Sequence, residues 1–479
     1  MRAASSKGEP CLKDTLEPKA VQPKKEGISV KKRFENLSLD LCRRAIEDCF
    51  KGKWGRNDTM TFVEKYAGIR RQEFWALWLE DPENMRLRNE AIDAITPMIM
   101  ETVEEIERGH DPEDMEPVTI RPRPDGMTGK IRDIAMLCVL HQILGHIAKL
   151  MIDPLLRARI EPTQHASIPG RGQTKLKDQT VKLLRKNPEI KYAIKTDVKS
   201  AYKSMTYAVC LGLIQKEIPT ARTAIALIGY LGRAAPGEHL IIGGYLDAWL
   251  FNYAMSYAVR YLRTIGKTRR GKIILSVKAC ETYMDDFALY ATSAKDLMRA
   301  VRCLQKWMAA NLGVTTKITT GIIKILQIDE EQKRKIKTGA ARTTPAVDTA
   351  GYRISRSHVT IRRRVWRKDR RQLLRAEKEY KRDGHLREIR AEKVIGCNSY
   401  ISQSDSNGIK EKYHVDELMK EAKRVASRRT KRERKEKKER IENALYGRGY
   451  RQAQKGHNRK APGRKEENPS DGQRSKKRG

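Results

Sequence analysis

The chain has 479 residues, of which 39% are hydrophobic and 33% are charged, so it is long enough for two to four packed lobes with tails. Its 99 Lys and Arg residues against 60 Asp and Glu give a formal net charge of +39, an excess typical of proteins that bind nucleic acids. A soluble protein with a basic tail shares this composition, so charge alone indicates a partner and no chemistry.

Several classes of protein are disfavoured. The eight cysteines are scattered and form no C-x-x-C pair, which argues against a zinc ribbon and favours a reducing compartment. The N-terminus lacks the apolar core of a signal peptide. The most apolar stretch, residues 223–258, is broken by Arg233, Glu238 and Asp247, which disfavours a membrane span. We therefore expect a cytoplasmic protein without a membrane partner.

Residues 1–30 are rich in Lys, Pro, Ser and Gly and are expected to be disordered. Apolar residues at three-to-four spacing then predict helices up to residue 107. The turn signal Asp125-Gly126 predicts a hairpin of strands 118–124 and 130–134. The elements expected next are helices at 136–160 and 173–186, a strand at 191–198, helices up to 261, strands at 273–279 and 287–291, a helix at 295–312, a strand pair at 351–361 and basic helices over 362–420.

Beyond Glu421 the chain is almost wholly charged and then rich in Gly, Asn and Arg. This pattern predicts a solvated helix that runs into a disordered tail. The tail could bind a dedicated structured RNA through electrostatics, and a solvated tail without a specific ligand fits equally well.

Adjacent carboxylates stand at a turn between two strand-forming runs, at Asp285 and Asp286. Two like charges side by side are costly unless a cation lies between them and another group, and Mg²⁺ prefers carboxylate and phosphate oxygens. An exposed turn is the alternative, and it is favoured for an isolated Asp-Asp pair. Asp197 changes this balance because it ends the strand at 191–198. Three carboxylates from neighbouring strands could hold two metal ions for an in-line displacement at phosphorus.

The residues around these carboxylates resemble the ordered motifs of prokaryotic reverse transcriptases. Asp197-Val-Lys-Ser-Ala-Tyr202 is similar to motif A, and Tyr283-Met-Asp-Asp286 is similar to motif C. The resemblance extends from about Val118 to Tyr413. Its other parts are residues 240–252 (motif B), 312–317 (motif D), 347–353 (the primer-grip motif E) and 399–413 (the end of a thumb helix bundle).

The resemblance implies an α+β fold of the right-hand polymerase type, with fingers, a palm built on an antiparallel sheet, and a helical thumb. The expected divisions are a disordered N-terminus (1–30), a helical N-terminal region (31–107), fingers and palm (108–340), a primer-grip region (341–361), a helical thumb (362–420) and a basic tail (421–479).

The resemblance implies an RNA-directed DNA polymerase that extends a DNA or RNA primer on an RNA template with dNTPs. It makes Asp197, Asp285 and Asp286 the catalytic residues. Together with Val198 they would be the ligands of two Mg²⁺ ions, or of Mn²⁺ in their place. The alternative is a non-catalytic RNA-binding protein that keeps the polymerase scaffold.

Five residues are expected at the nucleotide. Tyr202 matches an aromatic steric gate, which would clash with a ribose 2′-hydroxyl, and its alternative is a packing aromatic. Lys130 and Arg132 match the basic clamp on the triphosphate, with a generic basic surface as the alternative. Gly243 would let the backbone approach the nucleotide or template. Lys317 would be the general acid for pyrophosphate, and Lys324 competes for this role.

Template and primer contacts are expected at two loops and a strand: Gly170, Arg171, Gly172, Tyr283, Met284, Gly351 and Tyr352. The chain departs from the family at Ile242, where Gln is more usual, and at Asp247-Ala248, where Ser-Gln is common. These departures put fidelity and template preference in doubt. We interpret Asp247 as a helix-start residue, with an extra carboxylate near the cleft as the alternative.

Three biological settings fit a bacterial or phage-encoded enzyme of this kind: a mobile intron, a diversity-generating retroelement, and phage defence or a related bacterial role. The helical N-terminal region and the basic tail match neither of the first two well, so the third is favoured.

Overall fold

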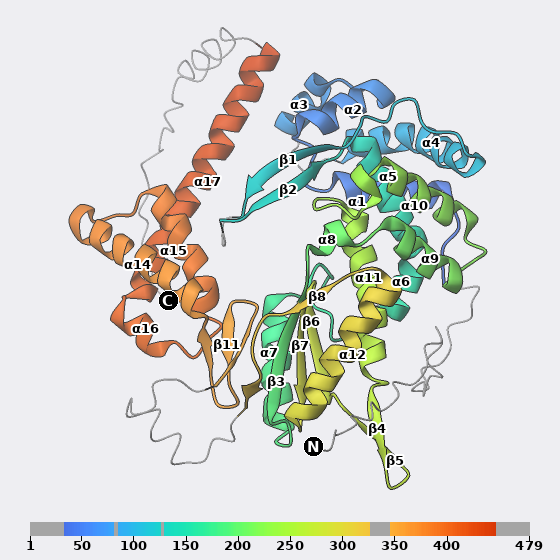
Figure 1. The fold of residues 1–479 in the computed structure, drawn as a ribbon. Coiled ribbons are helices and arrows are strands. Elements are labelled where there is room, and N and C mark those ends of the chain that lie inside the picture. Colours follow the sequence, from blue (N-terminus) through green and yellow to red (C-terminus); the bar gives the residue numbers. More distant parts are fainter. Residues whose placement is uncertain (1–32, 81–84, 126–128, 326–344, 447–479) are drawn as a thin grey trace, which may run out of the picture.

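The computed structural model describes residues 33–80, 85–125, 129–325 and 345–446 (Figure 1). The expected disorder at 1–30 and in the last part of the tail therefore lies outside the described residues. Helices and antiparallel strands together build the chain. None of the helices in the described ranges is long and apolar enough to cross a bilayer.

The N-terminal region is helical, as its spacing predicts. The Ser38 hydroxyl accepts a hydrogen bond from the Leu41 N–H at 3.2 Å and so caps the first helix. The apolar faces of α1 and α4 are buried in the main core. The elements are α1 (Leu39–Phe50), α2 (Asn57–Ala67), α3 (Arg71–Glu80) and α4 (Arg86–Arg108).

A two-stranded hairpin follows, with β1 (Thr119–Pro124) paired to β2 (Ile131–Met136), so the predicted hairpin is confirmed. The helix expected at 136–160 begins later, because Met136 is still paired with Thr119. It is also divided in two, since Pro154 lies at the start of the second helix. The two helices are α5 (Val139–Met151) and α6 (Asp153–Arg159).

The central sheet has the strand order β6-β7-β3-β8, and β9 also pairs with β3. Alternate residues of β3 serve different cores: Ile194 and Val198 pack in the main core, and Ala193 packs with α7 and the small C-terminal sheet. The strands are β3 (Tyr192–Val198), β6 (Ala279–Tyr283), β7 (Asp286–Ala291), β8 (Thr316–Ile318) and β9 (Ile323–Lys324).

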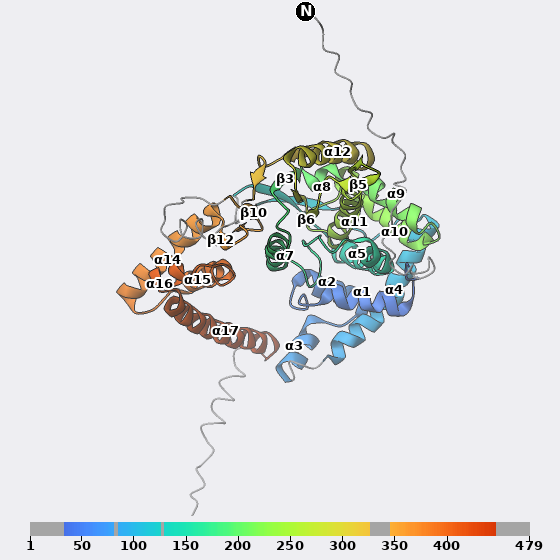
Figure 2. The same ribbon diagram turned by 90° about the horizontal axis from the view of Figure 1, so that it is seen from below.

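Helices surround this sheet and link its strands (Figures 1 and 2). The helices expected at 173–186 and 295–312 are confirmed, with one residue of difference at the second start. The helices are α7 (Gln173–Lys186), α8 (Ala201–Ser204), α9 (Tyr207–Glu217), α10 (Arg222–Ala234), η2 (Pro236–Glu238), α11 (Tyr245–Leu262) and α12 (Ala294–Leu312).

The strand expected at 273–279 is wrong in its extent. Its first residues belong to β5 (Lys272–Leu275), which pairs with β4 (Gly266–Arg269) in a separate exposed hairpin. Arg270 and Gly271 have positive φ values of 49° and 71°, which allows the tight turn of this hairpin. The strand before the carboxylates therefore begins only at Ala279.

The C-terminal part has its own hydrophobic core, separate from the main one. A three-stranded sheet precedes it where a strand pair was expected, because Val347–Thr349 adds a third strand. The last helix runs across the division expected at 420/421, and Glu421 and Ala422 are buried within it. The elements are β10 (Val347–Thr349), β11 (Tyr352–Ile354), β12 (Val359–Ile361), α14 (Arg363–Asp383), α15 (Glu388–Ile401), α16 (Asn407–Lys412) and α17 (Val415–Tyr446).

Candidate active site

Three carboxylates meet at one end of the central sheet. Asp197 on β3 lies directly opposite Asp286 on β7, and Asp285 stands in the two-residue turn that joins β6 to β7. Met284, the first residue of this turn, has a φ of 57°, the sign that two-residue hairpin turns require at this position. The register of two strand pairs thus brings together residues that lie almost ninety positions apart in the sequence.

The pKa of the Asp285 carboxyl is strongly raised. Burial raises its pKa to about 7, helped by the negative charge of Asp197, by a hydrogen bond with that side chain, and by the charge of Asp286. Each of these effects favours the protonated acid or penalises a second negative charge. The cluster therefore has an unmet requirement for positive charge.

Two lysines supply part of that charge. The Lys317 ammonium lies 2.9 Å from Asp197 Oδ2, and the pKa of Lys317 is raised by this contact. The Lys195 ammonium lies 3.2 Å from Asp286 Oδ2. Lys317 stands opposite Asp197 in the β3–β8 pairing, whereas Lys324 stands opposite Tyr192 at the other end of β3. Of the two lysines considered for the general acid, Lys317 is the one beside the carboxylates.

Sequence reasoning missed Lys195. Its side chain is 6% exposed, and it precedes Asp197 by two positions on β3, so both side chains project from the same face of the sheet. That spacing was visible in the sequence. The partner on β7 was not, because it depends on the register between strands.

Within the described residues, no three His, Cys, Asp or Glu side chains stand close enough together to form a ready metal site. The donor set nevertheless fits a hard divalent cation, since it offers carboxylate oxygens from three residues. Asp285, with its raised pKa, and the Lys317 ammonium on Asp197 show that the cluster attracts positive charge. Val198 donates its N–H to the Asp285 carbonyl at 3.1 Å, which ties β3 to the turn.

A second buried pair lies beneath the turn, and it too was missed from the sequence. His165 Nε2 lies 2.6 Å from Glu281 Oε2, and neither side chain is more than 7% exposed. The His165 N–H also donates to the Thr282 carbonyl at 3.1 Å. These contacts hold β6 in place from the loop before α7, so the turn has a rigid support.

Tyr202 lies on α8 and packs on Phe251, with ring centroids 5.5 Å apart and planes 17° from parallel. Burial raises its pKa, and the nearby charges of Asp247 and Asp285 add to the shift. The ring therefore makes the packing contact that is the alternative to a steric gate. It also lies close enough to Asp285 for the charge of that carboxylate to raise the pKa of the tyrosine.

Gly243 has a close neighbour within the protein. Its φ is +116°, and a Cβ there would lie 2.8 Å from the Ala135 carbonyl oxygen. The Ala135 N–H also donates to the Ile242 carbonyl at 2.8 Å. The glycine thus lets the chain before α11 approach the base of β2.

Asp247 lies in the first turn of α11, as the helix-start interpretation predicts. Its side chain is 2% exposed and accepts hydrogen bonds from the Ile241 N–H at 2.8 Å and the Tyr207 hydroxyl at 3.0 Å. Burial raises its pKa to about 6, although both hydrogen bonds oppose the shift. The carboxyl braces the chain before α11.

The basic residues expected at the triphosphate lie on the exposed hairpin. Lys130 precedes β2, which begins at Ile131, so only Arg132 lies within the strand. Arg132 pairs with Asp125 of the same hairpin at 3.2 Å. The structure therefore places Lys130 beside β2 and Arg132 within it.

The loop before α7 also uses its basic residue internally. Arg171 donates to the carbonyl oxygens of Glu161 and Gln164 at 2.6 and 2.7 Å. Gly170 and Gly172 have φ values of 72° and 137°, and Gly172 caps the N-terminus of α7. The two glycines allow the left-handed backbone of the loop, and the Arg171 guanidinium holds the loop by its hydrogen bonds to the two carbonyl oxygens.

Gly351 and Tyr352 join the small C-terminal sheet to α15. A Cβ on Gly351 would lie 2.4 Å from Tyr400 Cε1, and the Tyr352 and Tyr400 rings are 5.2 Å apart. The Tyr400 hydroxyl donates to Gln173 Oε1 on α7 at 3.2 Å. Both residues therefore contribute to packing between lobes.

Residues 121–319 match the family described as reverse transcriptase (RNA-dependent DNA polymerase). This segment includes the three carboxylates, Lys195, Lys317 and Tyr202, and it leaves out Lys324, the small C-terminal sheet and α15. The chain is similar to a solved structure titled "Structure of apo telomerase from Candida Tropicalis", with 10% identity and a TM-score of 0.36 over 70% of this chain and 71% of that chain. No curated protein matches the sequence.

Proposed function

We propose that this chain, whose residues 121–319 match the reverse transcriptase (RNA-dependent DNA polymerase) family, extends a DNA or RNA primer on an RNA template with dNTPs. The observation that carries this proposal is the meeting of Asp197, Asp285 and Asp286 across β3 and the β6–β7 turn. The three residues lie inside the matched segment, and their combined negative charge calls for cations.

The same three carboxylates would hold two divalent metal ions, with Mg²⁺ as the expected ion, and Val198 stands beside them. Bound ions of this kind supply activation of the primer 3′-hydroxyl and charge stabilisation at the leaving pyrophosphate. In the reaction the 3′-oxygen forms a bond to the α-phosphorus while the bond to pyrophosphate breaks.

Lys317 is proposed to donate a proton to the leaving pyrophosphate. Its ammonium lies 2.9 Å from Asp197 Oδ2, so it is already at the reacting end of the sheet. Its raised pKa keeps it protonated at neutral pH. A cation bound by Asp197 would free this ammonium to contact the departing phosphate.

Tyr202 is proposed to select deoxynucleotides. Its ring is held against Phe251 at a centroid distance of 5.5 Å, and a fixed aromatic surface can exclude a 2′-hydroxyl by contact. Lys130, Arg132 and Gly243 are proposed to line the nucleotide side, and residues 170–172, Tyr283, Met284, Gly351 and Tyr352 the template and primer side.

The lobes fit a right-hand interpretation. We assign fingers and palm to 108–340, the primer-grip region to 341–361 and the thumb to helices that begin at 362. The separate hydrophobic core of α14–α17 supports an independent thumb. A prokaryotic origin and a role in phage defence or a retroelement extend the same proposal.

The decisive measurement is primer extension on an RNA template with Mg²⁺ and dNTPs. We expect Asp285→Asn to lose at least about a thousandfold in rate, because it removes a charge that the metal ions need. Asp416→Asn, which removes an exposed carboxylate at the start of α17, should retain the wild-type rate. If Asp285→Asn and wild type are equally inert while both bind RNA, the RNA-binding scaffold interpretation replaces the enzyme.

Nucleotide selection is tested separately with Tyr202→Val and Tyr202→Phe. The valine variant should incorporate ribonucleotides about tenfold or more faster relative to dNTPs, because the obstructing ring is gone. The phenylalanine variant keeps the ring and should keep the selectivity. An unchanged ratio in the valine variant would show that Tyr202 is only a packing residue.

A further inference from the structure

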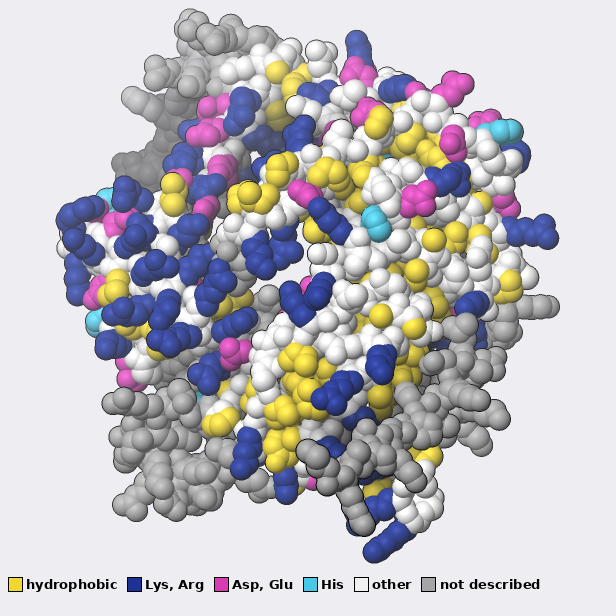
Figure 3. All heavy atoms as spheres, viewed as in Figure 1, with side chains coloured by type: hydrophobic (Ala, Val, Ile, Leu, Met, Phe, Trp, Pro, Cys, Tyr) yellow, Lys and Arg dark blue, Asp and Glu magenta, His cyan; other side chains and the backbone are white. Residues whose placement is uncertain are grey.

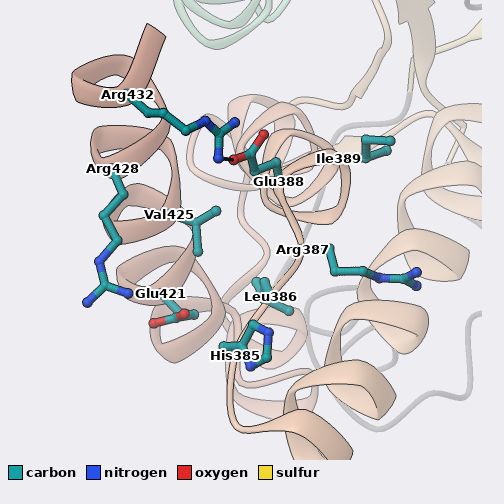
Figure 4. A pocket seen from close by; sticks show the side chains of 9 residues that line it. All are labelled: His385, Leu386, Arg387, Glu388, Ile389, Glu421, Val425, Arg428 and Arg432. Atoms are coloured by element: carbon teal, nitrogen blue, oxygen red, sulfur yellow. Dashed lines mark ion pairs between the residues drawn. The ribbon is translucent and has the colours of Figure 1, made fainter. Parts of the chain in front are cut away.

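The first part of the last helix, α17, packs in the α14–α17 lobe, and its ion pairs with α15 lie near the middle of the helix. Arg432 on α17 lies 2.7 Å from Glu388, the first residue of α15, and Arg429 pairs with Glu392 one turn further along α15. Figure 4 shows Val425 and Arg432 of α17 facing the chain that enters α15. The two helices run antiparallel, so α17 continues past the beginning of α15.

From Arg432 to Tyr446 the helix projects about 20 Å beyond these ion pairs. Nine of the ten residues from 431 to 440 are exposed, as expected for a solvated helix. Ile441 then breaks the pattern, with only 5% of its surface exposed. Something therefore covers the far end of α17.

Helix α3 contacts α17, although the two lie more than 300 positions apart in the sequence. Both views show α3 beside the end of α17 (Figures 1 and 2). Residues 74–77 of α3 are all apolar and partly buried, and four successive positions span a full helical turn, so the helix needs cover on more than one side. Phe74 covers one side by stacking on Trp54 at 5.4 Å.

This contact closes a ring of packed elements. From α17 the contacts lead through α15 to α14, whose hydrophobic core includes Ile361 of β12 in the small sheet. The small sheet contacts α7, and the path continues through the central sheet to α12, α11 and α5, and then to α1 and α2. Trp54, between α1 and α2, stacks on Phe74 of α3. Lys and Arg side chains gather over the α14–α17 lobe and beside the opening between that lobe and the rest of the molecule (Figure 3). The exposed strand β1 adds Arg121 and Arg123 on the other side.

We propose that the α3–α17 contact is a clasp that closes the chain around a primer–template duplex, so that the nucleic acid is topologically enclosed and leaves sideways only when the clasp opens. This inference rests on the proposed function for the identity of its ligand, an RNA–DNA duplex. The clasp is small and can open for loading. The closed clasp retains the duplex by enclosing it, and salt does not weaken this enclosure. Basic side chains add an electrostatic attraction, which salt does screen.

The test compares a DNA primer annealed to a circular RNA template with the same primer on a linear template of equal length. Full-length protein is bound to each and washed in about 1 M NaCl, where charges are screened beyond ~3 Å. Wild-type protein should stay on the circle at least about tenfold longer than on the linear template, from whose ends it can slide. Equal loss from circle and linear template would overturn the proposal.

Ile441→Glu should remove the difference between circle and linear template, because it puts a charge into the covered end of α17. Ala444→Glu, an exposed position one turn further on, adds the same charge and should behave as wild type. If Ile441→Glu fails to fold, truncation after Glu439 removes the clasp while leaving the ion pairs with α15, and truncation after Tyr446 is its control. A variant without the clasp that remains on the circle like wild type would contradict the proposal.

The readout is retention, which does not require catalysis, so it is repeated in the Asp285→Asn background. Retention on the circle with an unaffected reaction rate in Asp285→Asn would refute the active-site proposal and leave the clasp standing. Normal metal-dependent extension with no preference for the circle would do the reverse.

Discussion

The β6–β7 hairpin is buried along most of its length and is partly exposed at its turn and at Ala279, whereas every residue of β1 in the β1–β2 hairpin is exposed. The first is held by β3, by α7 and by the His165–Glu281 pair. The second is tied at its base, where Ala135 bonds to Ile242, and by the Lys203–Asp133 ion pair. Packing thus fixes the carboxylates and leaves the basic hairpin free to tilt.

The largest difference in the free energy of unfolding is expected between substitutions of one apolar residue in each hairpin. Phe287→Ala in β7 should lower the free energy of unfolding by about 3–5 kcal/mol, because the ring is fully buried and leaves a cavity. Ile131→Ala in β2, where the side chain is 74% exposed, should change it by less than about 0.5 kcal/mol. Urea denaturation measures both. Similar losses would show that the β1–β2 hairpin is packed in solution.

A pH dependence is expected from Asp247, which braces the chain before α11 to which the base of β2 is bonded. Its pKa rises from 3.8 to about 6 on folding, so between those values the folded state binds a proton that the unfolded state has lost. The stability from this group is complete below about pH 4 and is lost as the pH rises through 6, by up to ~3 kcal/mol. Asp247→Asn should lack this loss. Melting curves from pH 4 to 7 that stay parallel for the two proteins would contradict the assignment.

The smallest loss of stability is expected at Gly243, which lies against Ala135 of β2. Gly243→Ala should cost about 1–3 kcal/mol, because the backbone has a φ of +116° and a Cβ would lie 2.8 Å from the Ala135 carbonyl oxygen. It should also raise the KM for dNTPs by shifting β2. Gly212→Ala in α9, where a Cβ meets nothing within 4 Å, should be neutral or stabilising by about 0.4–1 kcal/mol. Equal behaviour of the two variants would show that β2 adjusts freely.

Local patterns were enough for much of this molecule. The β1–β2 hairpin, α7, β3 and α12 all follow from turn signals or apolar spacing over a few residues, because such elements depend on neighbours in the sequence. The spacing of motifs likewise identified Asp197, Tyr202 and the Asp285–Asp286 turn as one group. The strand predicted at 273–279 was too long, because residues 272–275 pair with β4 in a separate hairpin.

The sequence by itself determined which residue types could form the site, since short local patterns show carboxylates at the ends of strand-forming runs and at a tight turn. Only the tertiary structure decided their partners. The register between β3, β7 and β8 set Lys195 on Asp286 and Lys317 on Asp197, and the folding of the chain brought α3 to α17. Contacts between distant segments depend on the packing of all the elements between them, so no local pattern encodes them.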